Sequence, residues 1–235
     1  MAKRGKIIKR TPSREIDERP IKWRKYAHLF LIVCEDEKTE KYYFDTFKNF
    51  FPAETLFLRT VGTGKSSKGV VEQSVIERNG LYEESNKKID EVWAVFDKDD
   101  ADKTKGNKQR FIEAFEIANK EQINVAYSNE VFELWLLLHF SDVSSEMPIP
   151  RADIYTNLEK NIKRIPKHNS FAYKHGNKDI IDIVLISGNE NQAIVRADRL
   201  NFEHKSKKNQ PIDANPNTRV NVLVKKLREL IDWYS

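Results

Sequence analysis

Short apolar runs alternate with segments of helical periodicity over residues 28–140. The apolar runs are rich in branched residues and predict buried strands over 28–35, 55–61, 91–97 and 123–129. The segments that follow them predict helices over 38–51, 67–78, 106–121 and 131–140. Strands that are apolar almost throughout are typical of a parallel sheet covered by helices on both faces. The pattern therefore predicts an α/β fold with a parallel sheet of about four strands.

The pattern changes after residue 141, where Pro148 and Pro150 mark a linker. No strand pattern returns, and helices are predicted over 151–165, 178–187, 191–200 and 218–230. The Asn-Pro-Asn-Thr stretch at 215–218 is a typical start signal for the last of them. We therefore expect three parts: a basic, disordered arm over 1–25, an α/β domain over 26–141, and a helical extension over 142–235 packed on that domain.

The composition is that of a rather polar globular protein, with 39% hydrophobic and 33% charged residues. No apolar run approaches the roughly 20 residues that a membrane-spanning helix needs. The N-terminus is basic but lacks the apolar stretch of a signal peptide. The single cysteine, Cys34, cannot form an intramolecular disulfide, which fits a reducing compartment. We therefore expect a cytoplasmic protein that does not contact a membrane.

The net charge of +5 is concentrated at the N-terminus. The first 25 residues hold ten Lys and Arg against three Asp and Glu, so the rest of the chain is close to neutral. A basic arm suits contact with nucleic-acid phosphates, and the candidate contacts are Lys3, Arg4, Lys6, Lys9 and Arg10. The alternative is a leader that only keeps the protein in solution.

The stretch VGTGKSSKG over residues 61–69 looks like a phosphate-binding loop of an ATPase. That motif requires a glycine five positions before Gly64, where this chain has Arg59, so we expect no ATP site here. Lys65, beside the glycine turn, could still contact a phosphate at the start of the following helix. A flexible connection would have the same sequence.

The predicted strand over 91–97 runs directly into a cluster of carboxylates: Asp97, Asp99 and Asp100. If strand geometry continues, Asp97 and Asp99 project to the same side and could reach one ion, while Asp100 points to the other side. Mg²⁺ prefers such hard oxygen ligands. The alternative is an acidic turn in contact with solvent.

Further carboxylates follow two other predicted strands. Glu35 lies at the carboxyl end of the first strand and would face Asp97 if the two strands are neighbours. Clustered carboxylates repel one another unless a cation lies between them. Glu37 and Glu40 fall in the next helical turn, where the helix dipole explains Glu37. Glu133 is a lone carboxylate in the apolar segment after the fourth strand, a position that requires a partner or a metal.

Two other polar residues in this part of the chain each have two interpretations. Asn129 could cap the helix predicted over 131–140, or it could hold a water molecule or a phosphate. His139 could be a catalytic base, although a histidine in an apolar helix is more often a core residue with satisfied polar atoms.

Four stretches together resemble the RloB family, found beside bacterial restriction and defence genes: LIVCEDEKTEKYYF, AVFDKDD, YSNEVFELWLLLHF and NPNTRVNVLVKKL. The resemblance covers nearly the whole chain, including the basic leader. It implies a Toprim-like fold similar to the nuclease domain of OLD-type defence proteins. It also implies that a divalent metal, Mg²⁺ or Mn²⁺, is held by Glu35, Asp97 and Asp99. Glu133 and Glu40 match the family's F-E-L-W and T-E motifs.

Two positions depart from the family's pattern. Asp36 stands where a small glycine is usual, and it could add a ligand or crowd the turn. Glu130 stands where a proline is frequent. Neither departure changes the three residues that the resemblance assigns to the metal.

These observations lead to the hypothesis of a divalent-metal-dependent nuclease that cleaves RNA, tRNA included, or DNA as an effector of bacterial antiphage defence. The ion would polarise a phosphoryl oxygen and activate water. The expected catalytic residues are Glu35, Asp97, Asp99 and Glu133, and Glu40 joins the expected metal ligands. Glu133 and Glu40 could hold a second ion or act as a general base. Nucleic acid would also contact the lysine-rich helical part: Lys163, Arg164, Lys167 and Lys174.

The partners and two other classes of function stay open. By analogy with similar systems, a separate ATPase subunit would control the enzyme, and a homodimer is an open alternative to a monomer. The chain could instead be a non-catalytic nucleic-acid-binding or scaffolding subunit with a vestigial acidic cluster. It could also be a phosphoryl transferase of the haloacid-dehalogenase type, whose nucleophile loop has a similar D-x-D. Against this, Ala101 stands where that loop has Thr or Val, and the cluster follows the third strand, not the first.

Overall fold

A computed structural model describes residues 26–235, and the basic arm over 1–25 lies outside the described residues. Its centre is a parallel sheet in the order β2-β1-β3-β4. The strands are β1 (His28–Cys34), β2 (Leu56–Gly62), β3 (Glu91–Asp97) and β4 (Asn124–Ser128). The predicted α/β class with four parallel strands is confirmed.

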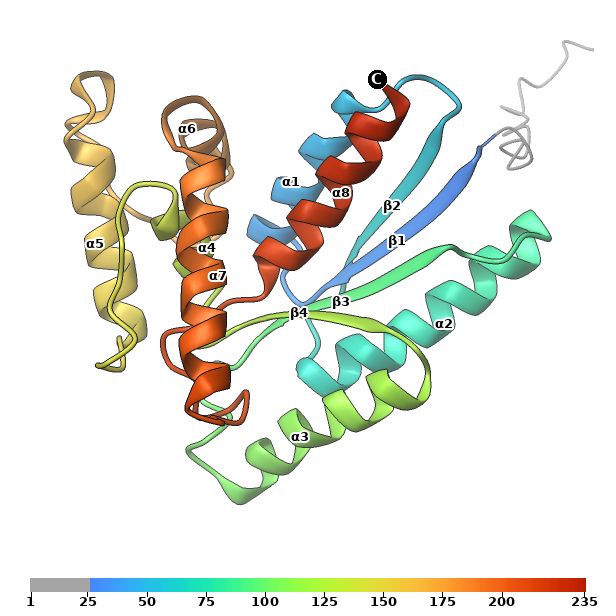
Figure 1. Cartoon of the computed structure of the whole chain (residues 1–235), viewed down its shortest axis with the longest axis horizontal. Coiled ribbons are helices and arrows are strands. Elements are labelled where there is room, and N and C mark those ends of the chain that lie inside the picture. The colour runs from blue at the N-terminus through green and yellow to red at the C-terminus, as the bar shows by residue number, and fades with distance from the viewer. Residues whose placement is uncertain (1–25) are drawn as a thin grey trace, which may run out of the picture.

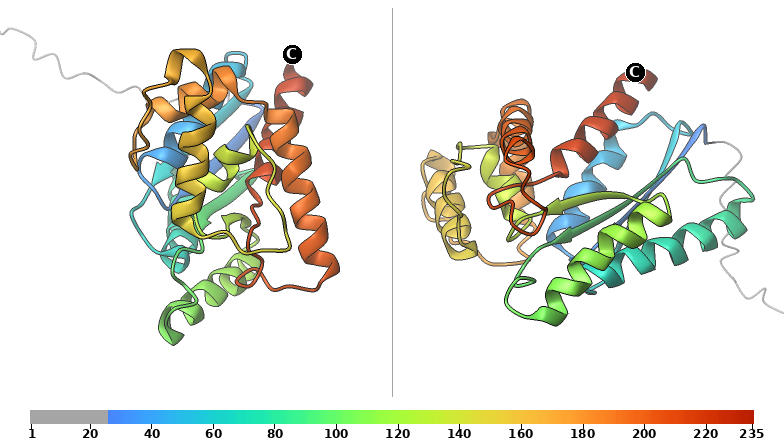
Figure 2. Two further views of the ribbon diagram at one scale, coloured as in Figure 1. Left: turned by 90° about the vertical axis from the view of Figure 1, so that its left-hand side faces the viewer. Right: turned by 60° about the horizontal axis from the view of Figure 1, so that its bottom comes forward.

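Helices cover both faces of this sheet (Figure 1). One face carries α2 (Ser67–Ser85) and α3 (Lys105–Lys120), and the other carries α1 (Thr39–Thr46) and α8 (Val220–Tyr234). Figure 2 shows the sheet between these two helical layers in its right-hand view. The strands support both layers because alternate residues bury on opposite faces. In β1, Leu29, Leu31 and Val33 join one core cluster, while Phe30 and Ile32 join the other.

The remaining helices stand beyond the carboxyl ends of the strands (Figure 1). They are α4 (Glu133–Leu138), α5 (Arg151–Lys163), α6 (Asp179–Ser187) and α7 (Glu190–Ser206). Their buried residues share one core cluster with α1, α8 and a face of the sheet. The boundary predicted at residue 141 between an α/β domain and a helical extension therefore stays a prediction, because one hydrophobic core contains residues from both sides of it. No helix among residues 26–235 has the length and apolar character to cross a membrane.

Several element boundaries differ from those predicted. The helix expected over 38–51 ends at Thr46 and continues as a 3-10 turn, η2 (Phe47–Phe50), and a second such turn, η3 (Pro166–His168), follows α5. The helix expected over 67–78 extends to Ser85, where Asn86 ends it with φ 49°. The helix expected over 131–140 is only six residues long.

The stretch at 215–218 directly precedes the last helix, and Thr218 Oγ1 accepts from the Val220 N–H at 3.3 Å. Helix α8 begins at Val220, and its N-cap Arg219 makes no side-chain capping bond. The stretch also pairs with β4: Thr218 forms an antiparallel bridge with Ser128, and the Asn129 N–H donates to the Asn217 carbonyl at 2.7 Å. The C-terminal segment thus braces the edge strand before α8 turns back over the sheet.

Candidate active site

The order β2-β1-β3-β4 makes the gap between β1 and β3 the switch point of the sheet. From β1 the chain moves outward to β2, and from β3 it moves outward to β4 on the other side. Ligands of open α/β sheets bind at the carboxyl ends of the strands on either side of such a point. Glu35 and Asp97 lie at these two ends, and the Glu35 N–H donates to the Val95 carbonyl at 2.9 Å. The fold therefore brings together the two carboxylates that the sequence placed at neighbouring strand ends.

Backbone N–H groups fix the positions of Glu35 and Asp97. Glu35 Oε2 accepts from the Asp97 N–H at 2.9 Å. Asp97 Oδ2 accepts from the Phe132 N–H at 2.9 Å, just before α4. Asp97 Oδ1 is buried and has no hydrogen-bond partner among residues 26–235. A buried carboxylate oxygen in this state requires an explanation, and a bound cation would supply one.

Asp99 reaches the same pocket by a different geometry from the one predicted. Strand β3 ends at Asp97, and Asp99 lies in a turn with φ 48°, so strand alternation does not place its side chain. The turn is held by the Asp99 N–H, which donates to the Glu130 carbonyl at 3.0 Å. Asp99 Oδ1 pairs with Arg151 Nη2 at 3.0 Å. Asp100 is exposed and pairs with Lys103, in agreement with its expected contact with solvent.

Glu40 and Asp36 hold the loop that follows β1. Glu40 is 1% exposed, and its Oε2 accepts from the Asp36 N–H at 3.1 Å. The Asp36 carboxylate accepts from the N–H groups of Lys38 and Thr39 at 3.0 and 2.9 Å. This reciprocal arrangement resembles a capping box, so Asp36 orders the turn. Gly62 leaves room for the loop, because a Cβ at that position would lie 2.5 Å from the Glu37 Cα.

Glu133 is 2% exposed and takes its partners from the helical part of the chain. Its Oε1 accepts from the Tyr173 hydroxyl at 2.5 Å and lies 3.6 Å from His175 Nδ1. Tyr173 stacks on Tyr155 of α5, with ring centroids 4.5 Å apart. We call Arg151, Tyr155, Tyr173 and His175 the helical wall of the site.

The carboxylates raise one another's pKa values. Burial, partly opposed by the Asp97 N–H, raises the pKa of Glu35 to about 7. Burial and the nearby Glu35 charge raise the pKa of Glu40, and burial with the Glu40 charge does the same for Asp97. Burial also raises the pKa of Asp99, although Arg151 opposes the shift. A full set of negative charges is therefore unfavourable here without a compensating cation.

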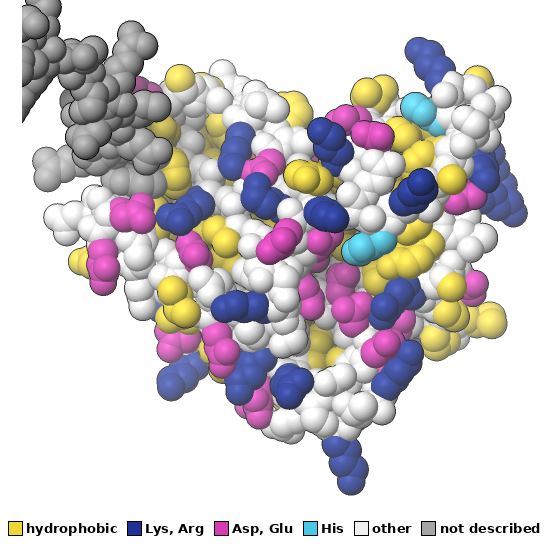
Figure 3. Space-filling view, turned by 180° about the vertical axis from the view of Figure 1, so that it is seen from behind, with side chains coloured by type: hydrophobic (Ala, Val, Ile, Leu, Met, Phe, Trp, Pro, Cys, Tyr) yellow, Lys and Arg dark blue, Asp and Glu magenta, His cyan; other side chains and the backbone are white. Residues whose placement is uncertain are grey.

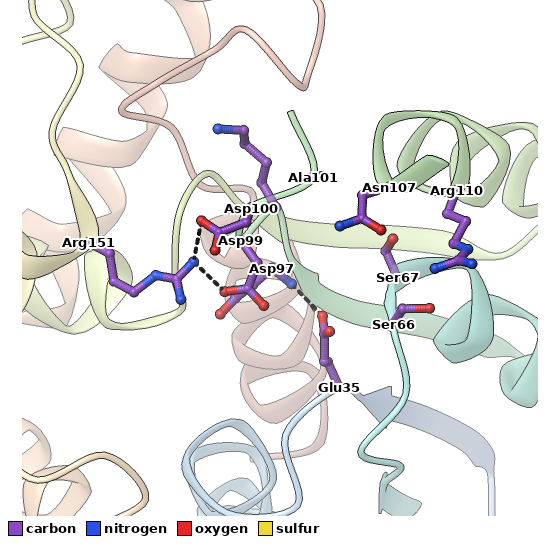
Figure 4. Close-up of a pocket in the computed structure, with 11 residues that line it drawn as sticks. Glu35, Ser66, Ser67, Asp97, Asp99, Asp100, Ala101, Asn107, Arg110 and Arg151 are labelled. Atoms are coloured by element: carbon purple, nitrogen blue, oxygen red, sulfur yellow. Dashed lines mark hydrogen bonds and ion pairs between the residues drawn. The ribbon is translucent and has the colours of Figure 1, made fainter. Parts of the chain in front are cut away.

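A pocket of about 280 Å³ lies against this cluster (Figure 4). Glu35, Asp97 and Asp99 form its acidic side. Asp100 lines it next to them. The rest of the lining includes Arg151, Arg110 and the start of α2 at Ser66 and Ser67. On the face seen in Figure 3, acidic side chains gather in the middle beside a histidine, and Lys and Arg side chains surround them. Cationic groups and free helix N–H groups opposite carboxylates suit a phosphate that is bridged to the acidic side by a cation.

The other candidate residues have varied positions. Lys65 is exposed, with Nζ donating to Gln73 at 2.7 Å, and Lys174 is exposed between Tyr173 and His175. The candidates in the arm (Lys3, Arg4, Lys6, Lys9 and Arg10) lie outside the described residues. No three His, Cys, Asp or Glu side chains within residues 26–235 are already placed as a metal-binding group.

Asn129 and His139 have structural roles. The Asn129 amide donates to the Pro211 carbonyl at 2.9 Å, and α4 has no side-chain cap, so the capping prediction is wrong. His139 is 3% exposed, its Nδ1 lies 3.0 Å from the Trp135 carbonyl, and burial lowers its pKa to about 4. These contacts place His139 in the core, with its Nε2 buried and without a hydrogen-bond partner in the described part of the chain.

The helical wall is the part of the site that sequence analysis missed. Its residues come from α5 and from the loop before α6, which periodicity assigned only to a helical extension. The Tyr-Lys-His sequence at 173–175 was the available signal, since it groups three polar side chains in a predicted loop. Glu130 has a φ of 71°, a conformation that proline cannot adopt.

Comparisons with known proteins give one match, to a protein family. No curated protein and no solved structure matches the chain. Residues 30–227 match a family model described as "RloB-like protein". This range includes every carboxylate of the cluster and all four strands of the sheet, apart from the first two residues of β1. The chain therefore belongs to the RloB-like protein family.

Proposed function

We propose that the chain is a divalent-metal-dependent nuclease with a Toprim-like site, acting on RNA or DNA. The observation that carries the proposal is the group of carboxylates at the switch point of the sheet, in which Asp97 Oδ1 is buried without a partner among residues 26–235. The donor set fits Mg²⁺ or Mn²⁺, which prefer carboxylate oxygens together with water and substrate phosphates. Glu35, Asp97 and Asp99 would hold the ion.

A bound divalent ion would supply Lewis-acid stabilisation of the phosphoryl oxygens and a water molecule of lowered pKa. The residues of the chain divide the remaining work. Arg110 and the N–H groups at the start of α2 would bind the substrate phosphate, since Arg110 makes no ion pair within residues 26–235. Glu40 orders the loop that carries Glu35. Glu133 would hold Tyr173 and His175 beside the carboxylate cluster.

Asp99 and Arg151 would change partners during this cycle. Their ion pair neutralises Asp99 in the structure, and Arg151 also lies 3.4 Å from Asp100. A cation shared by Asp99 and Asp97 would compete with Arg151, which would then be free to bind a phosphate oxygen. Arginine suits this second role because its planar fork matches phosphate geometry.

A second function rests on the same ion pair. If Arg151 is the permanent counter-charge of Asp99, the site is non-catalytic and the chain is a nucleic-acid-binding or scaffolding subunit.

Cleavage of tRNA and of plasmid DNA, each with Mg²⁺ or Mn²⁺, separates the two functions. The wild type should cleave at least one substrate, and Asp97→Ala should abolish cleavage while binding persists. Asp232→Asn, an exposed aspartate on α8, is the matched control and should cleave normally. Wild-type binding without cleavage under every condition would favour the non-catalytic subunit. Equal cleavage by Asp97→Ala would show that the site is assigned wrongly.

The biological setting is part of the proposal. A nuclease of this family would act in the cytoplasm as an effector of antiphage defence, with an ATPase subunit as its controlling partner. Co-expression of the chain with the product of an adjacent ATPase gene, followed by purification through one subunit, tests the partnership directly.

A further inference from the structure

A second pocket, of about 410 Å³, lies between α3, β4, α7 and the segment over 209–219. It shares no lining residue with the pocket at the carboxylate cluster. Its volume lies in the range of small-molecule sites, roughly 300–1,000 Å³. The sequence motif at 215–218 forms part of its lining, through Asn217, and the proposed nuclease chemistry does not involve this residue.

The charge of this pocket favours an anion. Arg219 and Lys205 both line it, both are exposed, and neither makes an ion pair within residues 26–235. The one carboxylate in the lining, Asp198, is already neutralised by Lys225 at 2.8 Å and accepts from the Asn221 amide at 2.7 Å. Two cations without counter-charges therefore face a pocket whose acid is satisfied.

The pocket also offers aromatic surface. Phe202 lies at its edge and is 71% exposed, so the face of its ring is open to a ligand. Phe115 and Tyr127 pack edge-to-face deeper in the lining, with ring centroids 5.4 Å apart. A flat ring could stack on Phe202 and cover it.

An unsatisfied polar group lies in the same lining. Asn217 is 4% exposed, and its Nδ2 donates to the Tyr127 hydroxyl at 3.1 Å. Its Oδ1 is buried and has no hydrogen-bond partner within the described residues. Buried amide oxygens are nearly always bonded, so this one points to a missing donor.

We propose that this second pocket binds a nucleotide, with the base stacked on Phe202 and the phosphate held by Arg219 and Lys205. The chemistry is shared by a free nucleotide and by an unpaired residue of a nucleic-acid strand. The proposal does not depend on the metal chemistry of the first pocket.

The pocket is nevertheless joined to the candidate active site through the backbone. The Arg219 N–H donates to the Tyr127 carbonyl at 2.8 Å, and the Asn129 N–H donates to the Asn217 carbonyl. The loop that follows Asn129 carries the Phe132 N–H, which holds Asp97. The nucleotide would thus bind against the same edge strand that leads into the carboxylate cluster.

Binding measurements on the full chain test the proposal. Calorimetry with AMP, GMP, CMP and UMP at millimolar concentration measures free nucleotides, and fluorescence anisotropy with a labelled single-stranded RNA oligonucleotide measures strand residues. Phe202→Ala and Arg219→Gln should each weaken binding at least about fivefold, as expected for one stacking or charge contact. Both side chains are exposed, so circular dichroism should show an unchanged fold.

The controls match each substitution with an exposed residue elsewhere. Ile186→Ala on α6 and Lys120→Gln at the end of α3 should leave affinity unchanged. Asp97→Asn should also retain mononucleotide binding, which separates this site from the proposed nuclease site. Binding of a mononucleotide identifies a free nucleotide as the ligand, and binding of the oligonucleotide alone identifies a strand residue. The proposal is overturned if neither probe binds, or if either pocket substitution leaves affinity unchanged.

Discussion

The carboxyl edge of the sheet and the helical wall both contribute to the carboxylate cluster, but different interactions position them. At the edge, Glu35 and Asp97 accept from backbone N–H groups that the sheet and its loops fix in place. At the wall, Arg151 and Tyr173 are held against the acids by side-chain contacts. Backbone bonds leave little freedom, whereas side-chain pairs can exchange partners. The edge is therefore suited to catalysis, which needs groups held in fixed positions, and the wall to binding by side chains that can change partners. Four substitutions and conditions test this difference.

Glu35→Gln should have the largest effect on activity. The amide can still accept from the Asp97 N–H but brings no charge to an ion, so cleavage should fall at least about 100-fold. Glu37→Gln, an exposed neighbour in the same loop, is the control and should retain activity. Single-turnover cleavage at saturating protein measures both variants. Normal activity of the Glu35→Gln protein would show that the carboxylates of the edge take no part in cleavage.

The metal-free protein should lose stability as the pH rises from about 4.5 to about 7. In this window folded Glu35, with its pKa near 7, holds a proton that the unfolded chain has lost at its ordinary value of 4.5. The folded state thus binds more protons, and its free energy of unfolding should fall by roughly 2–3 kcal/mol. Urea unfolding in EDTA across this range measures the change. Glu35→Gln should make the profile less steep, with the raised pKa values of Glu40, Asp97 and Asp99 accounting for the slope that stays. An unchanged slope in that variant would contradict the assigned pKa.

Tyr173→Phe should cost stability more than chemistry. It removes the hydroxyl that donates to buried Glu133, leaving that oxygen with His175 alone, a loss of about 1–3 kcal/mol. Tyr42→Phe, at an exposed position on α1, should be neutral. Urea midpoints compared with cleavage rates separate the two effects. A large loss of cleavage rate at unchanged stability would show that Tyr173 takes part in the cleavage reaction.

Arg151→Gln should have the smallest effect, and it should change the affinities for nucleic acid and for Mn²⁺ in opposite directions. Nucleic-acid affinity should fall by about tenfold as a phosphate contact is lost. Mn²⁺ affinity should rise, because Asp99 no longer has an internal counter-charge. Anisotropy and Mn²⁺ titration of the same preparation measure the pair, with Lys160→Gln on α5 as control. If both affinities fell together, Arg151 would stabilise the carboxylates of the edge and would not compete with the cation for Asp99.

The sequence predicted the edge because its signals are local. Short continuous apolar runs locate β1 and β3, which are buried on both faces, and Glu35 and Asp97 are the residues where those runs end. Asp99 was assigned to the site for a wrong reason, since a left-handed φ at a turn leaves no reliable mark in a strand pattern. The wall was not predictable because its contacts join distant positions: Tyr173 and Glu133 are 40 residues apart. Helical periodicity predicts that α5 exists but not which end of it reaches a carboxylate.

The central claim is that the edge carboxylates bind a catalytic divalent ion. Anomalous scattering at the manganese edge from crystals soaked in Mn²⁺ tests it most directly. The account predicts a peak within bonding distance of Asp97 Oδ1 and Glu35, with Arg151 turned away from Asp99. An empty site with the Arg151–Asp99 pair intact, in crystals that bind Mn²⁺ elsewhere, would contradict it.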